Sequence, residues 1–88
     1  MAKPSNKRSL TIARHRTSIS LEDGFWTALH EFAEADGRSV ADVVSEIDQG
    51  RDKDDARSSL SAAIRLYILE RMQARHILER MQARRKTP

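Results

Sequence analysis

The residues with the clearest chemical potential in this 88-residue sequence are basic side chains near its N-terminus. Residues 1–21 carry a charge of +5 and no acidic residue, whereas residues 22–55 carry −8 and residues 56–88 carry +6. The basic residues of the first segment are Lys3, Lys7, Arg8, Arg14 and Arg16. Such a cluster attracts phosphate groups, and it favours a nucleic acid as the partner. The alternative is a solvated tail that only keeps the chain in solution.

The sequence lacks the residues that disulfides, metal sites and nucleophilic catalysis require. The sequence contains no cysteine, which excludes disulfides, cysteine-ligated zinc sites and thiol nucleophiles. His15, His30 and His76 lie too far apart along the chain for the usual spacing of metal ligands. No nucleophile occurs together with a base. We therefore expect neither an enzyme nor a metal or other cofactor.

An alternating pattern over residues 10–21 predicts the one β-strand that we expect in this chain. Its apolar phase contains Thr17, Ile19 and Leu21, and its polar phase contains Arg14, Arg16, Ser18 and Ser20. A single strand leaves its backbone N–H and C=O groups unpaired, so it must pair with another strand. Because a chain of this size can form only a thin hydrophobic core, we expect self-association to supply further buried surface.

The first predicted helix runs from about Glu22 to Asp36. Apolar residues recur along it at helical spacing, and they are Phe25, Leu29, Phe32 and Ala33. The segment Ser20–Asp23 has the spacing of a capping box at the start of a helix. Gly37 has the position of a left-handed residue that ends one.

Two further helices are predicted beyond Gly37. The second helix begins at Ser39, where Ser39–Asp42 again has capping-box spacing. Its apolar face consists of Val40, Val43, Val44 and Ile47. A polar loop follows at Gly50–Asp55, and the third helix begins near Ser58 or Ser59.

The C-terminal part contains the same octapeptide twice. Ile68–Arg75 recurs unchanged as Ile77–Arg84, nine positions later. Because nine residues at about 100° each amount to two and a half turns, an unbroken helix would turn the apolar side chains of the second copy away from the face used by the first. We therefore predict a short tandem duplication whose second copy is largely exposed. The alternative is that this copy binds a partner protein.

The order of these elements resembles that of the ribbon-helix-helix DNA-binding family, which includes Arc and MetJ. The resemblance is carried by Arg16–Glu22 for the strand, Phe25–Ala33 for the first helix and Gly37–Val40 for the turn. It covers roughly Leu10 to Met72 and is similar to a branch of short bacterial proteins with a third helix. The fold that it implies is mainly α with one β-strand. Two chains pair their strands antiparallel as a homodimer, and a C-terminal third helix follows.

The resemblance also implies residues that contact bases. In the family, the two-stranded ribbon enters the major groove of duplex DNA, and its outward side chains read base edges. By alternation these residues are Arg16, Ser18 and Ser20, with Arg14 further along the strand. Arg16 is the best candidate for specificity, because a guanidinium can bond guanine O6 and N7 together.

Phosphate contacts and a subunit interface are implied in the same way. Free backbone amides at Ser39 and Val40 would contact a phosphate, and Lys7 and Arg8 would contact the flanking DNA backbone. The residues expected between the two subunits are Thr17, Ile19, Leu21, Phe25, Leu29, Val40, Val44 and Ile47. Such a dimer is expected to be obligate, since a lone strand would lie over an open core.

These features predict three parts: a basic flexible arm (residues 1–9), a ribbon-helix-helix domain with a third helix (residues 10–75) and a duplicated basic C-terminal extension (residues 76–88). The predicted function is sequence-specific binding of duplex DNA by a homodimer that regulates transcription, in the bacterial cytoplasm and, on DNA, in the nucleoid. The alternative is a protein-interaction module, such as an antitoxin-like dimer whose C-terminal helix binds a partner protein. No apolar run of about 18 residues occurs, so no membrane-spanning segment is expected.

Overall fold

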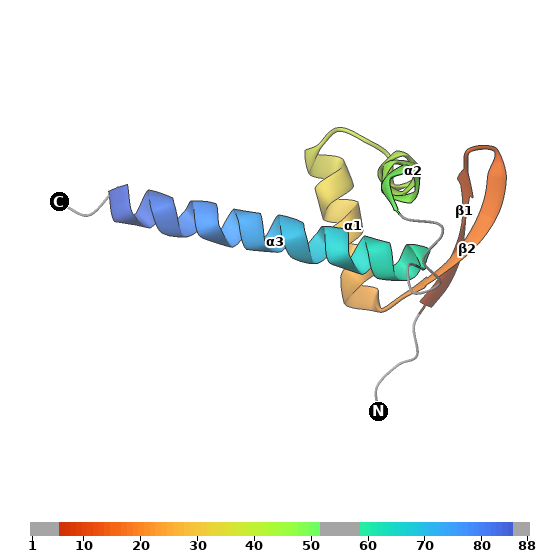
Figure 1. Ribbon diagram of the computed structural model, residues 1–88, viewed down its shortest axis with the longest axis horizontal. Coiled ribbons are helices and arrows are strands. Elements are labelled where there is room, and N and C mark those ends of the chain that lie inside the picture. The colour runs from red at the N-terminus through yellow and green to blue at the C-terminus, as the bar shows by residue number, and fades with distance from the viewer. Residues whose placement is uncertain (1–5, 52–58, 86–88) are drawn as a thin grey trace, which may run out of the picture.

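The computed structural model describes residues 6–51 and 59–85. Its elements are β1 (Asn6–Ile12), β2 (His15–Leu21), α1 (Asp23–Ala35), α2 (Val40–Gly50) and α3 (Leu60–Arg85). Figure 1 shows the hairpin of β1 and β2, α1 and α2 gathered around the first half of α3, whose second half extends alone. The fold is therefore mainly helical with a two-stranded antiparallel sheet.

The N-terminal region is a hairpin, and the prediction of a single strand over residues 10–21 is wrong. β1 pairs antiparallel with β2 along the full length of both strands. Ala13 and Arg14 form the turn between them, and both have positive φ, at 50° and 69°. This is the pattern of a two-residue type I′ turn, whose twist matches that of the strands. Because β2 has a partner in its own chain, an unpaired strand no longer makes a second subunit obligatory.

Part of the basic arm that was predicted for residues 1–9 belongs to β1. Residues 6–9 form the first half of β1 and pair with the end of β2. They are therefore an ordered strand and not a flexible arm. The rest of that arm, residues 1–5, lies outside the described residues.

The start of α1 differs from the prediction, whereas its end agrees with it. Glu22 is the N-cap residue and makes no side-chain capping bond; Ser20 cannot cap the helix because it remains in β2. At the other end, Gly37 has a φ of 66°, and the Arg38 N–H donates to the Ala33 carbonyl at 2.9 Å. This is a helix end closed by a left-handed residue, as predicted for Gly37.

The predicted starts of α2 and α3 are confirmed. Ser39 Oγ accepts a hydrogen bond from the Asp42 N–H at 3.1 Å. In the same way, Ser59 Oγ accepts one from the Ala62 N–H at 3.1 Å. Each serine satisfies one of the backbone donors that the first turn of a helix leaves free. Most of the polar loop predicted between these helices lies outside the described residues.

The hydrophobic core lies between the apolar face of the hairpin, α1, α2 and the first half of α3. Its members are Ile12, Ile19, Leu21, Trp26, Leu29, Phe32, Ala33, Val43, Val44, Ile64 and Ile68. Because Ile64 and Ile68 of α3 complete this core, a second subunit is not needed to close it. Of the residues predicted for the subunit interface, four are buried in the chain's own core: Ile19, Leu21, Leu29 and Val44. The other four are half-buried, namely Thr17, Phe25, Val40 and Ile47.

α3 is one unbroken helix that continues through His76. The prediction for the second copy of the octapeptide is confirmed, since Ile77, Leu78 and Met81 are all more than half exposed. Ile68, the equivalent of Ile77 in the first copy, is buried. Within the described residues, no helix is both long and apolar enough to cross a membrane.

Candidate nucleic-acid interface

The hairpin has an apolar face against the core and a polar face away from it. Every second residue of each strand lies on the polar side, and the register places these residues opposite one another: Lys7 with Ser20, Ser9 with Ser18, and Thr11 with Arg16. Ser20 is half-buried, and the other five are exposed. We call these six residues the polar hairpin face. It presents two rows of three hydrogen-bonding side chains on a rigid two-stranded ribbon.

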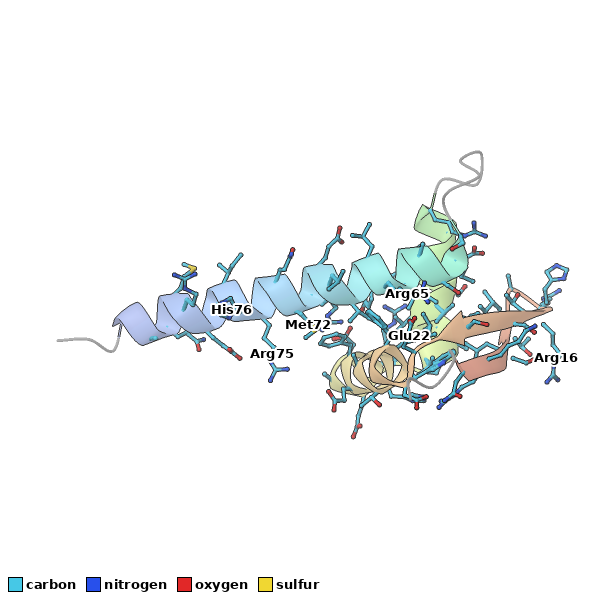
Figure 2. The ribbon with its side chains drawn as sticks, turned by 90° about the horizontal axis from the view of Figure 1, so that it is seen from below. Arg16, Glu22, Arg65, Met72, Arg75 and His76 are labelled. Atoms are coloured by element: carbon cyan, nitrogen blue, oxygen red, sulfur yellow. The ribbon has the colours of Figure 1, made fainter. Side chains whose placement is uncertain are left out.

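The structure brings together the residues that were predicted to contact bases. Arg16, Ser18 and Ser20 share the polar hairpin face, and Arg14 lies in the turn at its tip. Figure 2 shows Arg16 projecting at the hairpin end of the molecule, far from the second half of α3. Lys7, which was predicted to contact the DNA backbone, lies on the same face as Arg16.

Two members of the polar hairpin face, Ser9 and Thr11, were missed because β1 was not recognised in full. The sequence does carry a signal for them. The core residue Ile12 has an even number, whereas the core residues Ile19 and Leu21 have odd numbers. An apolar phase that changes within an alternating segment indicates two strands joined by an even number of turn residues.

The hairpin and the helix that follows it carry charges of opposite sign. Residues 6–21 contain four basic residues and no acidic one, whereas α1 contains Asp23, Glu31 and Glu34 and neither lysine nor arginine. Lys7, Arg14 and Arg16 are exposed on the polar hairpin face or at its tip. This end of the molecule therefore has the positive potential that a phosphate backbone needs.

Arg8 lies on the other side of β1 and fixes this strand to α1. Its guanidinium lies over the ring of the buried Trp26, 4.8 Å from the centroid, and 3.4 Å from His30 Nε2. Trp26 Nε1 donates to the Asn6 carbonyl at 3.0 Å, and the Asn6 amide donates to the Asp23 carboxylate. Contact with a phosphate would compete with this stacking, so the assignment of Arg8 to the DNA backbone stays a prediction with less support.

A second set of contacts fixes the end of β2. Arg65 of α3 donates two hydrogen bonds to the Glu22 carboxylate, at 2.9 and 3.3 Å. The same guanidinium lies 5.8 Å from the centroid of the Phe25 ring. Figure 2 shows Glu22 and Arg65 close together where the hairpin meets α1 and α3. The polar hairpin face is thus held at a fixed orientation to the helices.

The start of α2, predicted to contact a phosphate, has a mixed electrostatic character. Ser39 is exposed and acts as the N-cap. The acidic Asp42 in the first turn opposes a phosphate beside the free amide of Val40. Arg38 offers no compensating free charge, because its Nη1 lies 2.6 Å from Glu46 Oε2. Ser39 and Val40 as phosphate contacts therefore stay a prediction.

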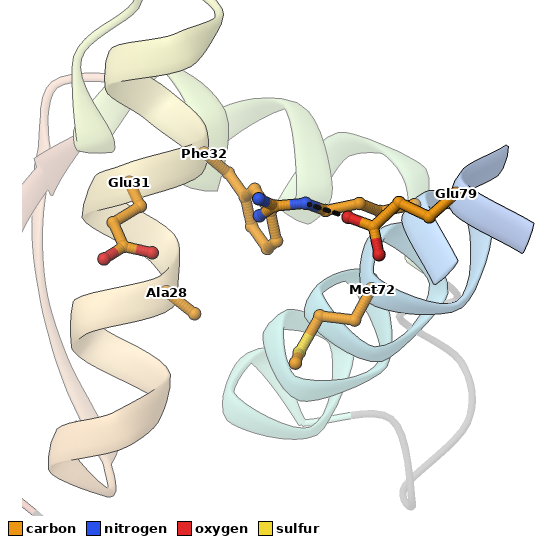
Figure 3. A pocket seen from close by; sticks show the side chains of 6 residues that line it. Ala28, Glu31, Phe32, Met72 and Glu79 are labelled. Carbon is orange, nitrogen blue, oxygen red and sulfur yellow. Dashed lines mark ion pairs between the residues drawn. The ribbon is translucent and has the colours of Figure 1, made fainter. Parts of the chain in front are cut away.

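An open cleft of about 320 Å³ lies between α1 and the middle of α3. Figure 3 shows its lining residues, which are Ala28, Glu31, Phe32, Met72, Arg75 and Glu79. Arg75 Nε pairs with Glu79 Oε1 at 3.3 Å. These side chains offer apolar contact and charge but no activated nucleophile.

The comparisons with known proteins identify one family for most of the chain. A family model described as a ribbon-helix-helix domain matches residues 5–72. This range contains both strands, α1, α2 and the first half of α3, and it ends before the second copy of the octapeptide. No curated protein and no solved structure matches the chain.

Proposed function

Because this chain belongs to the ribbon-helix-helix family, we propose that it binds duplex DNA through the polar hairpin face and regulates transcription. Members of the family are usually DNA-binding regulators, some are antitoxins, and they typically dimerise rather than catalyse reactions. A regulator of this kind would act on the bacterial chromosome, in the cytoplasm and nucleoid.

One observation carries the proposal: the outward side of the hairpin is polar throughout and carries basic residues but no acidic one. Its six side chains contain two positive charges, three hydroxyls of serine and one of threonine, and no carboxylate. The major groove of B-DNA is about 12 Å wide and admits a two-stranded ribbon. The hairpin therefore has both the shape and the chemistry to contact base edges.

We assign the base contacts within this face by side-chain reach. Arg16 is the long side chain on β2 and can donate to guanine O6 and N7 together. Ser18 and Ser20 are shorter and discriminate less between bases. Arg14 was predicted to contact bases, but it lies in the turn at the tip of the hairpin, and we propose that it contacts a flanking phosphate instead.

A homodimer is part of this proposal, although the core and the sheet are complete without it. The half-buried residues Thr17, Phe25, Val40 and Ile47 offer apolar surface for a second subunit. In such a dimer each chain would present one polar hairpin face, so the two faces would contact two segments of the same duplex.

The test compares two arginines that carry the same charge at opposite ends of the molecule. Duplexes are first selected by the wild-type protein from a random pool, and dissociation constants are then measured by fluorescence anisotropy. Arg16→Ala should weaken binding by roughly 5- to 150-fold and relax the base preference at one position, the loss expected for a bidentate guanine contact. The control Arg80→Ala removes an exposed α3 charge and should leave affinity and preference unchanged. Equal effects of the two variants would refute the assignment of Arg16.

A protein-interaction module is the second candidate, and a specific observation favours it. In the part of the chain that the structure describes, every exposed large hydrophobic side chain lies on α3: Leu66, Leu69, Met72, Ile77, Leu78 and Met81. Exposed apolar surface of this kind marks contact sites for other proteins. The cleft between α1 and α3 adjoins it through Met72.

A truncation after Arg75 separates the two candidates. DNA binding through the polar hairpin face predicts that the shortened protein retains its affinity for the selected duplex. An interaction module predicts instead that it loses a protein that co-purifies with the full chain. Circular dichroism of the truncated protein shows whether the remaining part keeps its fold.

A further inference from the structure

We infer that two molecules of this chain associate through the outward side of α3, with the two helices antiparallel and Gln73 at the two-fold axis. The side chains that make this contact are Leu66, Leu69, Gln73, Ile77 and Met81, which we call the outer stripe. The contact is separate from the homodimer surface proposed above, and it does not depend on DNA binding.

The outer stripe lies on the side of α3 that faces away from the core. At about 100° per residue its five members fall within an arc of about 120°, and the buried Ile64 and Ile68 lie on the opposite side of the helix. The four apolar members are 48–58% exposed, and Gln73 is exposed as well. Figure 1 shows the second half of α3 extending away from the other elements, so a second helix can approach it. An apolar row on the solvent side of a helix favours a partner there.

The spacing of the outer stripe is nearly symmetric about Gln73. Leu69 and Ile77 lie four residues before and after it, Leu66 lies seven before it, and Met81 lies eight after it. A two-fold axis at Gln73 therefore brings Leu69 against Ile77 of the second molecule, and Leu66 against Met81. Because a two-fold contact must be complementary to itself, this symmetry favours a second molecule of the same chain over an unrelated protein.

The charges of the elements favour the antiparallel orientation. α1 and α2 contain six acidic residues and neither lysine nor arginine. From Arg75 to Arg85, α3 has four arginines against one glutamate, a net charge of +3. An antiparallel pair brings this basic end near the acidic helices of the other molecule, whereas a parallel pair would bring two basic ends together.

Gln73 fixes the register of the pair. Its side-chain amide has donors and an acceptor, so the two amides at the axis can hydrogen-bond to each other. A shift by one helical turn would place each amide against an apolar side chain and remove this bond. Arg80 then lies opposite Leu66 of the second molecule, where its aliphatic stem can cover the leucine while its charge stays in water.

The contact is small, and its size sets its strength. Two helices that touch over about 22 Å associate in the micromolar range or more weakly. The outer stripe is therefore unpaired in dilute solution and pairs when the protein is concentrated. Two molecules on neighbouring sites of one duplex would be concentrated in this way and would bind cooperatively. This last consequence rests on the proposed function, whereas the pairing itself does not.

Two adjacent substitutions test the pairing on the full-length protein without DNA. Ile77 belongs to the outer stripe, whereas Leu78 points about 100° away from it, and they are similarly exposed, at 58% and 55%. The mass is measured by sedimentation equilibrium from about 10 μM to about 1 mM, the range in which weak association is seen. Ile77→Glu should abolish the association of the wild type at high concentration. The matched control Leu78→Glu should associate as the wild type does.

The contrary results are distinct from a failure of the proposed function. A wild-type mass that does not depend on concentration, or equal effects of Ile77→Glu and Leu78→Glu, would overturn the inference. Neither residue lies in the core or on the proposed homodimer surface, so loss of folding or of that homodimer does not produce a difference between the two variants. Because no DNA is present, a protein that fails to select a duplex leaves this result unchanged.

Single cysteines test the antiparallel register. The natural chain has no cysteine, and residues at the axis of two touching helices are close enough for a disulfide. Gln73→Cys should therefore oxidise to a linked pair of molecules on non-reducing electrophoresis. The control Gln82→Cys changes the equivalent residue of the second octapeptide, which lies on the other side of α3, and it should stay unlinked.

A third cysteine variant separates the two orientations. In the antiparallel pair the two copies of residue 77 are about 12 Å apart along the helices, so Ile77→Cys should not link. A linked pair at position 77 would indicate parallel helices, and the absence of a link at position 73 would exclude the proposed axis. Either result would overturn the inference.

Discussion

The two copies of the octapeptide, residues 68–75 and 77–84, have the same sequence and different surroundings. Ile68 of the first copy is buried in the core at 1% exposure, whereas Ile77 of the second is 58% exposed. The two copies are related by two and a half turns of an unbroken helix, which points them in opposite directions. Their position on α3 relative to α1 and α2, and not their composition, decides whether they stabilise the fold.

The arginines of the two copies show the same contrast. Arg71 pairs with Asp36 at the end of α1, at 2.5 and 3.2 Å, and lies 4.6 Å from the centroid of the Phe32 ring. It also donates to the Tyr67 hydroxyl at 2.9 Å. Arg80, its equivalent, is exposed. One copy therefore fastens α3 to α1, and the other is available to solvent or to a partner.

The largest expected difference between the copies comes from their isoleucines. Ile68→Ala should lower the free energy of unfolding by about 2–5 kcal/mol, because it leaves a cavity in the core. Ile77→Ala should change it by less than about 0.5 kcal/mol. Urea unfolding followed by circular dichroism measures both. If Ile68→Ala does not fold, Ile68→Val should still lower the free energy of unfolding by about 0.5–1.5 kcal/mol. Equal effects of substitution at positions 68 and 77 would contradict the packing of α3.

A smaller difference is expected for the arginines. Arg71→Ala should lower the free energy of unfolding by about 1 kcal/mol, since its ion pair and ring contact are both partly exposed to solvent. Arg80→Ala should have no measurable effect in the same urea titration. A loss at position 80 as large as that at position 71 would show that the second copy also contacts the folded domain.

The smallest expected effect concerns pH. Hydrogen bonds from Arg71 hold the pKa of Asp36 below its ordinary value. The ionised carboxylate therefore stabilises the fold fully above about pH 3.9, the ordinary value for aspartate, and this contribution is lost as the pH falls below it. Asp36→Asn lacks the contribution. The difference in unfolding free energy between wild type and variant should thus be constant near neutrality and shrink in acid; a difference that grows in acid would exclude the pairing.

The helices could be predicted from the sequence because local signals mark them. Ser39 and Gly37 act on the backbone next to them, so their effects depend little on the rest of the fold. The hairpin turn could not be predicted in this way, since Ala13 and Arg14 are not the asparagine and glycine that usually occupy a type I′ turn. Tertiary pairing of β1 with β2 must offset the cost of two non-glycine residues with positive φ.

The candidate site was predictable only where it lies on one strand. Alternation placed Arg16 and Ser18 on a common face, and the structure agrees. Ser9 and Thr11 could not be assigned to that face without knowing that β1 exists as a separate strand. The contact of Arg8 with Trp26 joins residues that are far apart in sequence, and such contacts leave no periodic signal.

The most direct measurement is a titration of the isotope-labelled protein with a selected duplex, followed by amide chemical shifts in NMR spectra. Binding through the polar hairpin face predicts shift changes concentrated at residues 7–20, with the amides of residues 76–83 at the end of α3 unchanged. Shift changes concentrated in α3, with the hairpin unaffected, would contradict the account.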